Sequence, residues 1–182
     1  MMTEKQKMIN GDLYNASDAE LIIERKRARL LLKQLNNLND DELKQQVLKE
    51  LIPDQGLDFW VEPPFFCDYG TNIIVGDKVF FNFNCTILDV MKVTIGNNVL
   101  FGPAIQVYTA THPMDYKERS SGLEFAKPVT IGSDVWIGGG VIICPGVTIG
   151  DRCVIGAGSV VTKNIAADTF AAGNPCRPIK SL

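Results

Sequence analysis

Aliphatic residues return at every sixth position through the second half of the chain. The series is Ile131, Ile137, Ile143, Ile149, Ile155 and Val161, and the same spacing appears upstream at Val75, Phe81 and Ile87 and at Ile95, Phe101 and Val107. A second apolar residue often follows four positions later, as at Val79, Cys85, Val99, Ile105, Val135, Val141, Val147 and Cys153. A six-residue period matches neither the 3.6-residue turn of an α-helix nor the alternation of a strand. It predicts a β-solenoid of triangular section, with one hexapeptide per face and two inward residues in each hexapeptide.

Glycine follows most of these inward positions, at the points where one face of the solenoid would turn into the next. These glycines are Gly76, Gly96, Gly102, Gly132, Gly138, Gly150 and Gly156. Because glycine has no Cβ, it adopts backbone angles that other residues avoid. The sequence therefore predicts that glycine provides the conformational freedom needed at the corners, and that Asn82 replaces it once, as asparagine often does in turns.

The six-residue rhythm breaks twice. After Ile87 the next inward position comes eight residues later, which predicts a two-residue bulge near residues 89–92. Between Val107 and Ile131 the spacing is twenty-four residues, and the polar residues 109–128 lack the repeat. We interpret residues 109–128 as a loop that leaves the solenoid wall. Long insertions of this kind in compact domains are usually functional.

The insertion contains His112, the only histidine of the chain. The following residue, Pro113, keeps the backbone of His112 out of the helical region, so the imidazole is expected on an extended segment. With a pKa near neutrality, an imidazole is well suited to removing a proton from a hydroxyl group at physiological pH. His112 is therefore a candidate general base, although a lone histidine is often a surface or hydrogen-bonded structural residue.

Five segments together resemble the maltose and galactoside O-acetyltransferases, a family of hexapeptide-repeat acyltransferases. They are residues 8–14 (MINGDLY), 82–86 (NFNCT), 109–113 (TATHP), 131–138 (IGSDVWIG) and 172–180 (AGNPCRPIK). The similarity extends over nearly the whole chain and is nearest to the maltose type. It implies a mainly β fold, a left-handed parallel β-helix with a short N-terminal helical segment and one long loop. The handedness follows only from the resemblance, because parallel crossovers are generally right-handed.

The resemblance also implies a reaction. Members of this family transfer an acetyl group from acetyl-CoA directly to a sugar hydroxyl, without a covalent enzyme intermediate, and no metal is required. His112 matches the general base, and Glu124 or a loop carbonyl is expected to orient its imidazole. Asn82 matches an asparagine beside the reacting centre, where it would orient the acceptor hydroxyl or stabilise the oxyanion together with a backbone N–H near Gly139. The alternative for Asn82 is a purely conformational role at a corner.

Further residues of both binding sites follow from the same resemblance. On the acceptor side they are Asp68, Asn82, Asn84 and Glu124. On the acetyl-CoA side they are Trp136, Gly139, Ala157, Thr162, Lys163, Arg177 and Lys180, where small residues admit the pantetheine arm and cations meet phosphates. The small residues have an alternative role in solenoid packing, and the cations have one as solvated surface charges. Trp136 has an alternative role in a contact with a neighbouring subunit.

The acceptor is less well defined by the sequence. Galactoside-type members have aspartate where this chain has Val90 and tyrosine where it has Phe80, which favours a maltose or glucose-type acceptor. Maltose-type members often have aspartate at the position of Asn84, which leaves that assignment open. The alternatives are an acetyltransferase for a non-sugar acceptor, such as an antibiotic or an amino acid, and a non-catalytic solenoid scaffold.

Residues 1–58 are predicted to form a helical segment and residues 59–182 the β-helix domain. Capping patterns at residues 17–20 and 39–42 precede apolar periodicity over residues 21–35 and 43–51, which predicts two short helices. A cluster of cations lies on the first of these helices, at Arg25, Lys26, Arg27 and Arg29. The net charge of −3 and pI of about 5.2 favour a solvated helix face over a nucleic-acid site.

Composition agrees with an intracellular enzyme. No apolar run has the length of a membrane span, and the first residues lack the core of a signal peptide, so a cytoplasmic location is expected without a membrane partner. The five cysteines show no CxxC pairing, which favours reduced thiols. One histidine is too few for the zinc-binding cluster of a carbonic-anhydrase-type solenoid. The family resemblance implies a homotrimer in which His112 of one subunit faces the groove of the next.

Overall fold

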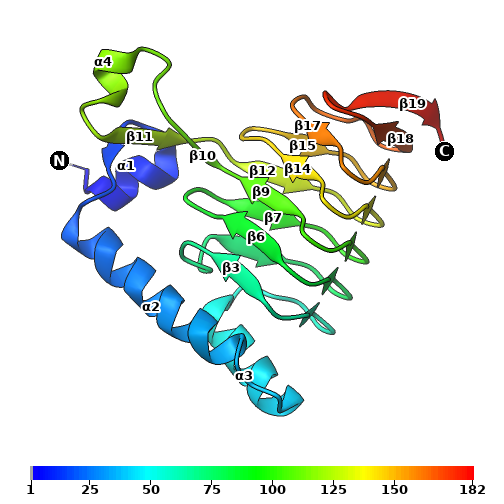
Figure 1. Ribbon diagram of the computed structural model, residues 1–182, viewed down its shortest axis with the longest axis horizontal. Helices are drawn as coiled ribbons and strands as arrows, with labels where there is room; N and C mark the ends of the chain where they lie inside the picture. Colours follow the sequence, from blue (N-terminus) through cyan, green and yellow to red (C-terminus); the bar gives the residue numbers. More distant parts are fainter. Residues whose placement is uncertain (1) are drawn as a thin grey trace.

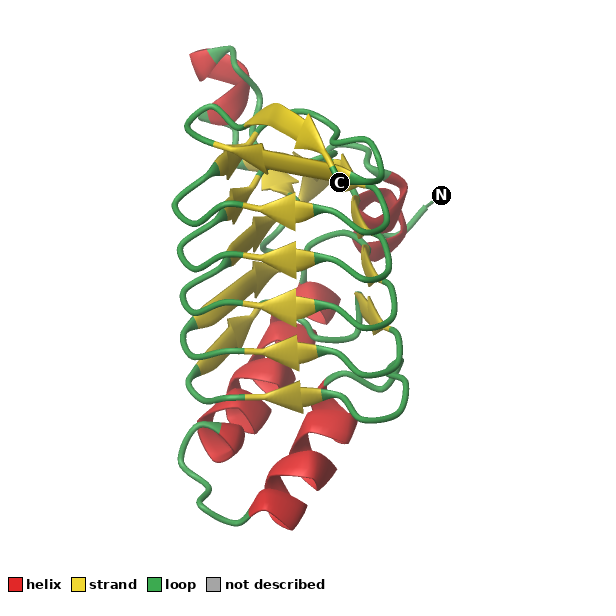
Figure 2. Cartoon of the chain, turned by 90° about the vertical axis from the view of Figure 1, so that its right-hand side faces the viewer, coloured by secondary structure: helices red, strands yellow, loops and turns green. Residues whose placement is uncertain are grey.

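The computed structural model describes residues 2–182 and has the predicted architecture of a β-solenoid. Figure 2 shows its coils stacked one above another, with short strands in register. The strands form three parallel walls, and only the last strand of the largest wall, β19, runs antiparallel to its neighbour. The seven-stranded wall contains β2 (Trp60–Val61), β5 (Phe80–Phe81), β8 (Leu100–Phe101), β13 (Trp136–Ile137), β16 (Val154–Ile155), β18 (Thr169–Ala172) and β19 (Arg177–Ser181).

Two further walls complete the triangle. The five-stranded wall contains β3 (Phe65–Cys67), β6 (Cys85–Leu88), β9 (Gln106–Tyr108), β14 (Ile142–Ile143) and β17 (Val160–Val161). The four-stranded wall contains β4 (Ile73–Val75), β7 (Val93–Ile95), β12 (Val129–Ile131) and β15 (Thr148–Ile149). Each inward residue pairs with its equivalent in the next coil, for example Val75 with Ile95 and Ile95 with Ile131. The six-residue period is thus the repeat of the walls, and the predicted fold class is confirmed.

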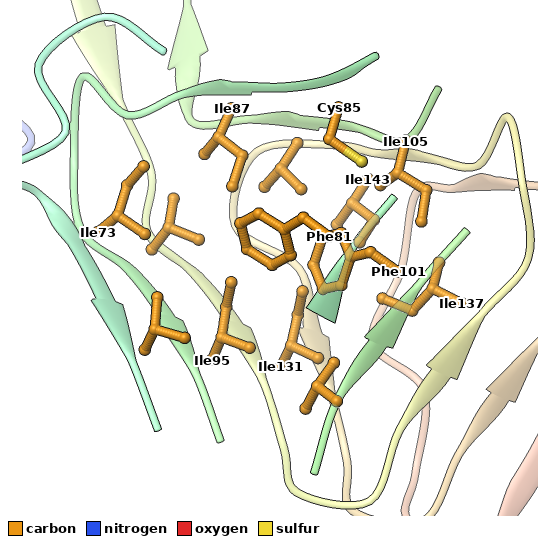
Figure 3. Close-up of a cluster of buried hydrophobic side chains, with 14 of the residues drawn as sticks. Ile73, Phe81, Cys85, Ile87, Ile95, Phe101, Ile105, Ile131, Ile137 and Ile143 are labelled. Atoms are coloured by element: carbon orange, nitrogen blue, oxygen red, sulfur yellow. The ribbon is translucent and has the colours of Figure 1, made fainter. Parts of the chain in front are cut away.

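The inward positions form one continuous apolar core along the solenoid axis. Figure 3 shows Ile87 from the five-stranded wall and Ile95 and Ile131 from the four-stranded wall around the rings of Phe81 and Phe101, which belong to the seven-stranded wall. The two rings are tilted by 40° to each other, with centroids 4.4 Å apart. Since the side chains of all five residues are at most 2 % exposed, the transfer of apolar surface from water holds the coils together.

The glycines after the inward positions have a different role from the one predicted. None of these seven glycines has a φ between +20° and +160°. Instead, a Cβ on Gly102 would lie 2.6 Å from the nitrogen of Gly139 in the next coil, so close approach of the coils excludes a side chain there. The left-handed residue of each corner comes two positions later and is frequently not glycine, as at Ala104 (φ 57°) and Asn84 (φ 61°).

Helices close the N-terminal end of the solenoid. These are α2 (Ala19–Leu35) and α3 (Asp41–Leu51), which Figure 1 shows beneath the first coils, whereas α1 (Glu4–Asn10) lies beside the strand at Leu123–Ala126. The buried leucines of α3 and those at positions 31, 32 and 35 of α2 belong to the same apolar cluster as the solenoid core, and Leu21 belongs to a second cluster with Met8 and Tyr14. The two predicted helices are present, and α1 is an additional helix whose capping box joins Thr3 and Gln6. The N-caps of α2 and α3 are Asp18 and Asp40, because their carboxylates accept from backbone N–H groups of the first turns.

The predicted long loop is a small hairpin with its own helix. It contains β10 (Ala110–Thr111), α4 (Tyr116–Arg119) and β11 (Leu123–Ala126), and β11 also pairs with β1 (Tyr14–Asn15). The pairing is antiparallel and sets Tyr14 opposite Glu124. In Figure 1 the hairpin leaves the solenoid wall beside α1. The N-terminal segment therefore holds the insertion in place, although the division at residue 58 stays a prediction.

Three corners separate the walls, and two of them matter for the site. The glycine corner joins the seven-stranded to the five-stranded wall at residues 82–84, 102–104, 138–140 and 156–158. The insertion corner joins the five-stranded to the four-stranded wall at residues 68–72, 89–92, 109–128, 144–147 and 162–164. The eight-residue spacing from Ile87 to Ile95 is repeated from Cys67 to Val75, so the insertion corner is two residues wider in both of these coils.

Two further observations concern the whole chain. Among residues 2–182, no helix has both the length and the apolar character needed to cross a membrane. Cys67, Cys85, Cys144, Cys153 and Cys176 are free thiols, in agreement with the absence of pairing motifs. Burial raises the pKa of the Cys85 thiol to about 11, so this thiol is a packing residue and not a nucleophile.

Candidate active site at the insertion corner

A polar pocket of about 320 Å³ lies between the insertion hairpin, α2 and the first two coils. It is lined by Tyr14, Ala16, Arg25, Arg29, Asp68, Tyr69, Val90, Ala110, His112 and Glu124. Three of the predicted site residues are therefore in one place, namely His112, Asp68 and Glu124. They come from distant parts of the sequence and meet because β11 pairs with the N-terminal strand above the corner.

Hydrogen bonds fix two aromatic side chains of the pocket. The hydroxyl of Tyr14 donates to Glu124 Oε2 at 2.8 Å. Arg25 Nη1 donates to the hydroxyl oxygen of Tyr69 at 2.7 Å, and Arg25 Nη2 donates to the Ala16 carbonyl at 2.6 Å. The guanidinium carbon of Arg25 also lies 5.7 Å from the centroid of the Tyr69 ring. The pocket is thus preorganised by bonds that join the N-terminal segment to the solenoid.

Burial controls the electrostatics of the pocket. It raises the pKa of Asp68, an effect that Arg25 and Arg29 oppose through their charges. It also raises the pKa of Tyr14, to which the hydrogen bond with Glu124 adds. Both tyrosines therefore keep their protons at neutral pH and remain available as hydrogen-bond donors and acceptors. Carboxylates, phenols and guanidinium groups are the side chains that bind the hydroxyl groups of a small polar ligand.

His112 lies on the rim of this pocket, directly after β10. Its side chain is exposed in the single chain, whereas the following Pro113 is buried and fixes the backbone. Within residues 2–182 the imidazole has no hydrogen bond to Glu124 or to a loop carbonyl, the two orienting groups expected from the sequence. Glu124 lines the same pocket and uses Oε2 for Tyr14, so its Oε1 is the carboxylate oxygen left for another partner.

The glycine corner carries a second group of predicted residues. Asn82 Oδ1 accepts from the backbone N–H of Phe83 at 2.7 Å, and the exposed Asn84 occupies the left-handed position. Gly139 and Ala157 lie in later coils of the same corner, where the N–H of Gly158 donates to the Gly139 carbonyl at 2.9 Å. Asn82, Gly139 and Ala157 thus lie along one edge of the solenoid.

The remaining predicted residues lie on open surface. Trp136 projects from the seven-stranded wall with 57 % of its area exposed. Arg177 and Lys180 are exposed on β19 at the end of the same wall. Thr162 and Lys163 lie instead at the insertion corner, beyond β17.

The structure therefore divides the predicted site between two corners. His112, Asp68 and Glu124 belong to the insertion corner, and Asn82 and Gly139 belong to the glycine corner. The five-stranded wall lies between them, and its strand β6 has four residues, which corresponds to roughly 13 Å. Within one chain the histidine and the asparagine are on opposite edges of that wall.

Sequence reasoning missed several pocket residues. Tyr69 and Arg25 have no motif of their own, Tyr14 lies in the resembling segment at residues 8–14 but was given no role in the site, and Arg25 was assigned to a solvated helix face. In the structure Arg25 is half-buried and bonded to Tyr69. One signal was present, because the cations of α2 recur at positions 25 and 29, one helical turn apart on the same side. No group of three or more potential metal ligands is gathered in the described part of the chain.

Comparison with known proteins defines first the class and then the family. Residues 128–163 match the family model described as "Bacterial transferase hexapeptide (six repeats)", which identifies a hexapeptide-repeat transferase. Residues 7–56 match the "Maltose acetyltransferase hexapeptide capping motif". Galactoside O-acetyltransferase from Escherichia coli K12 is 42 % identical over 183 residues, covering 100 % of this chain and 89 % of the relative. The chain belongs to the maltose and galactoside O-acetyltransferase family and is an acetyltransferase.

Solved structures agree with this assignment. A maltose O-acetyltransferase from Clostridium difficile 630 is 51 % identical and superposes with a TM-score of 0.98, covering 100 % of this chain and 98 % of the other. A hexapeptide-repeat acetyltransferase from Vibrio cholerae, solved in complex with acetyl coenzyme A, is 40 % identical with a TM-score of 0.93. The match covers 100 % of this chain and 99 % of the Vibrio cholerae chain. The predicted family is therefore confirmed.

Proposed function

We propose that this protein transfers an acetyl group from acetyl-CoA to a hydroxyl of a sugar of the maltose or glucose type. The observation that carries the proposal is the position of His112. The only imidazole of the chain lies on the rim of a polar pocket that also contains Asp68 and Glu124. In a chain of this family, such a pocket is suited to hold an acceptor hydroxyl beside a general base.

In the proposed mechanism, His112 removes the proton of the acceptor hydroxyl while the oxygen attacks the thioester carbon of acetyl-CoA. The C–O bond forms and a tetrahedral intermediate develops, with its negative charge on the former carbonyl oxygen. The C–S bond then breaks, and the imidazolium returns its proton to the leaving thiolate of coenzyme A. General-base catalysis of this kind contributes roughly 10²–10⁴-fold to the rate. No acetyl group is attached to the enzyme at any stage.

Two groups of the glycine corner are proposed to assist this step. The carboxamide of Asn82 would orient the acceptor or donate to the oxyanion, and the backbone N–H of Gly139 is a second candidate donor. Removal of one oxyanion donor typically costs roughly 2.7–4 kcal/mol of the activation barrier. The small size of Gly139 and Ala157 leaves the corner open to the pantetheine arm.

Acetyl-CoA is proposed to lie along the same edge. The exposed Trp136 supports this placement, because it offers an apolar surface on β13, the strand directly before Gly139. Arg177 and Lys180 of the seven-stranded wall are proposed to meet the polar end of the cofactor, because lysine and arginine bind phosphates through charge-assisted hydrogen bonds. Thr162 and Lys163 lie at the insertion corner and are proposed to meet it from the neighbouring copy.

The division of the site between two corners supports a homotrimer. In a closed three-fold ring each subunit contacts its two neighbours through different surfaces. The insertion corner of one copy would then meet the glycine corner of the next, and His112 would face Asn82 of the neighbour. A ladder of outward apolar residues next to the glycine corner, including Phe80, Leu100 and Trp136, is available for this contact.

The acceptor pocket supports a neutral sugar of the maltose type over a galactoside. Val90 contributes a buried apolar surface to the pocket at the position where galactoside-type members have aspartate. Carboxylates at Asp68 and Glu124 remain to bind sugar hydroxyls. A cytoplasmic location is also proposed, because five free thiols are typical of a reducing compartment.

The test is the release of free coenzyme A with a panel of acceptors. Glucose, glucosides and maltose are compared with galactosides, amino acids and aminoglycosides at saturating acetyl-CoA. The proposal predicts the highest kcat/KM with a glucose-type acceptor. A higher value with an amine acceptor would replace the sugar assignment, and failure to bind acetyl-CoA in a calorimetric titration would instead support the scaffold hypothesis.

A further inference from the structure

Asp89 lies in the middle of the insertion corner and is fully buried. Its Oδ1 accepts hydrogen bonds from the backbone N–H groups of Asp68 and Tyr69, both at 2.9 Å. Asp68 and Tyr69 line the acceptor pocket with their side chains. The Asp89 carboxylate therefore holds two pocket residues from behind the pocket wall.

The same aspartate also fixes the end of that turn. The N–H of Asn72 donates to Asp89 Oδ2 at 3.4 Å, and Asn72 Nδ2 donates to the Asp89 carbonyl at 2.7 Å. Residues 68–72 are thus bound at both ends to one residue of the next coil. This turn is the widened corner of the first coil, where no regular strand pairing would otherwise hold its backbone.

Thr109, a second fully buried polar residue, continues the connection toward the insertion. Its Oγ1 donates to the Leu88 carbonyl at 2.7 Å and accepts from the N–H of Met91 at 2.9 Å. The carbonyl of Thr109 accepts from the N–H of Lys127 at 2.9 Å, which closes the base of the hairpin. The segment at residues 88–91 is therefore hydrogen-bonded on one side to the turn at residues 68–72 and on the other to the base of the hairpin that carries His112.

A titratable acid at this position needs an explanation, because burial of a carboxyl group costs free energy unless its hydrogen bonds compensate. Burial raises the pKa of Asp89 to about 7, the charge of Asp68 adds to this effect, and the N–H groups of Tyr69 and Asp68 oppose it. Within residues 2–182 no salt bridge neutralises Asp89. An apolar residue would fill the same space without the cost of burying a polar group, so the hydrogen bonds to the pocket turn are the distinctive contribution of Asp89.

We propose that Asp89 is a positioning residue of the acceptor site, which fixes Asp68 and Tyr69 relative to the hairpin of His112. The inference rests on the proposed function, since it assumes that this pocket binds the acceptor. Tyr69 in turn holds Arg25, so one buried carboxylate determines the placement of three pocket side chains. A small displacement of such groups is costly, because misplacement by about 1 Å reduces rates by roughly 10²-fold.

The test compares three variants of the full-length protein. Asp89→Leu removes the acceptor oxygens and keeps the branched shape of the side chain, and Asp89→Asn keeps one carbonyl oxygen for the two N–H groups. Asp77→Leu is the matched control, because Asp77 Oδ1 also accepts a backbone N–H from another coil, that of Leu57 at 2.7 Å, at the corner away from the site. Kinetics are measured with maltose and with acetyl-CoA as the varied substrate.

For Asp89→Leu the proposal predicts an increase of about tenfold or more in the KM for maltose. The KM for acetyl-CoA stays within about twofold, Asp89→Asn restores the KM for maltose to within about threefold, and Asp77→Leu leaves both values near those of the wild type. An unchanged KM for maltose in Asp89→Leu, with only a lower melting temperature, would overturn the proposal. An equal increase of both KM values would overturn it as well.

A second readout separates this inference from the proposed function. Amide hydrogen exchange is followed by mass spectrometry in the peptide that covers residues 66–72. Faster exchange in Asp89→Leu than in Asp89→Asn and Asp77→Leu supports the positioning role, and equal exchange in all variants overturns it. If the wild type transfers no acetyl group to any sugar, the proposed function is wrong, and the exchange rates still decide whether Asp89 holds this turn.

Discussion

Mixing two inactive variants tests whether each active site is shared between subunits. His112→Ala removes the proposed base, and Asn82→Ala removes the proposed carboxamide. The two residues lie on opposite edges of the five-stranded wall, separated by roughly 13 Å along β6. If the site forms between copies, a mixed trimer contains interfaces at which an intact His112 faces an intact Asn82.

The expected recovery follows from the geometry of a ring. At each interface one copy contributes the insertion corner and the next contributes the glycine corner. After random assembly of equal amounts, the first copy is Asn82→Ala with a probability of one half. The second copy is His112→Ala with the same probability of one half. Averaged over all trimers this gives about one quarter of the wild-type activity per site, and doubly tagged trimers are expected to show about one third, because each contains one such interface among its three. Alone, His112→Ala is expected to retain about 10⁻²–10⁻⁴ of the wild-type rate. Asn82→Ala alone is expected to retain about 10⁻²–10⁻³ of that rate.

The experiment refolds the two variants together, with different affinity tags, and measures coenzyme A release by the doubly tagged trimers. Two tagged forms of His112→Ala, mixed in the same way, are the control and should show no recovery. Mixed trimers with no activity above the separate variants would refute the shared site. Activity near one third of the wild-type value in the doubly tagged trimers would support the assignment of His112 and Asn82 to different subunits.

Two further predictions concern stability. In the folded protein Asp89 stays protonated up to about pH 7, because its pKa is raised to about 7. In the unfolded chain the same carboxyl group loses its proton near its ordinary pKa of 3.8. The contribution of Asp89 to the free energy of unfolding therefore falls as the pH rises from 4 to 7. Urea unfolding at pH 4.5 and 7.5 should therefore show that the stability of the wild type relative to Asp89→Asn decreases at the higher pH, by up to about 4 kcal/mol; an increase would contradict the raised pKa. At the glycine corner, Gly102→Ala should lower the free energy of unfolding by about 1–3 kcal/mol, because its Cβ would lie 2.6 Å from the Gly139 nitrogen. Ala104→Gly should raise it by about 1 kcal/mol through relief of a left-handed conformation, and chemical denaturation that shows the same sign for both would disprove the distinction.

The solenoid was predictable from the sequence because its stability comes from a local repeat. Each inward residue, such as Ile95 or Ile131, is buried against its equivalent one coil away, so the same six-residue pattern is required in every coil. The helices α2 and α3 were also predictable from apolar spacing, but not their first residues, and the short helices α1 and α4 were not predicted. Ser17 and Asp18 are both good capping residues, and only the backbone geometry selects Asp18.

The candidate site was less predictable, because it depends on contacts between distant segments. His112 was identified as the only histidine of the insertion, Asp68 and Glu124 were found through the family resemblance, and the pocket contains all three. Tyr14 could not be found, since its bond to Glu124 joins residues 110 positions apart through a pairing that has no local pattern. The role of the corner glycines was misjudged for a similar reason, because the atoms that exclude a Cβ belong to the next coil.

The most direct test of the central claim is the rate of acetyl transfer to maltose by the wild type and by His112→Ala, each as a purified and folded protein. If His112 is the general base, kcat falls by roughly 10²–10⁴-fold while the KM for acetyl-CoA stays within a fewfold of the wild type. A His112→Ala variant with wild-type kcat would contradict the account.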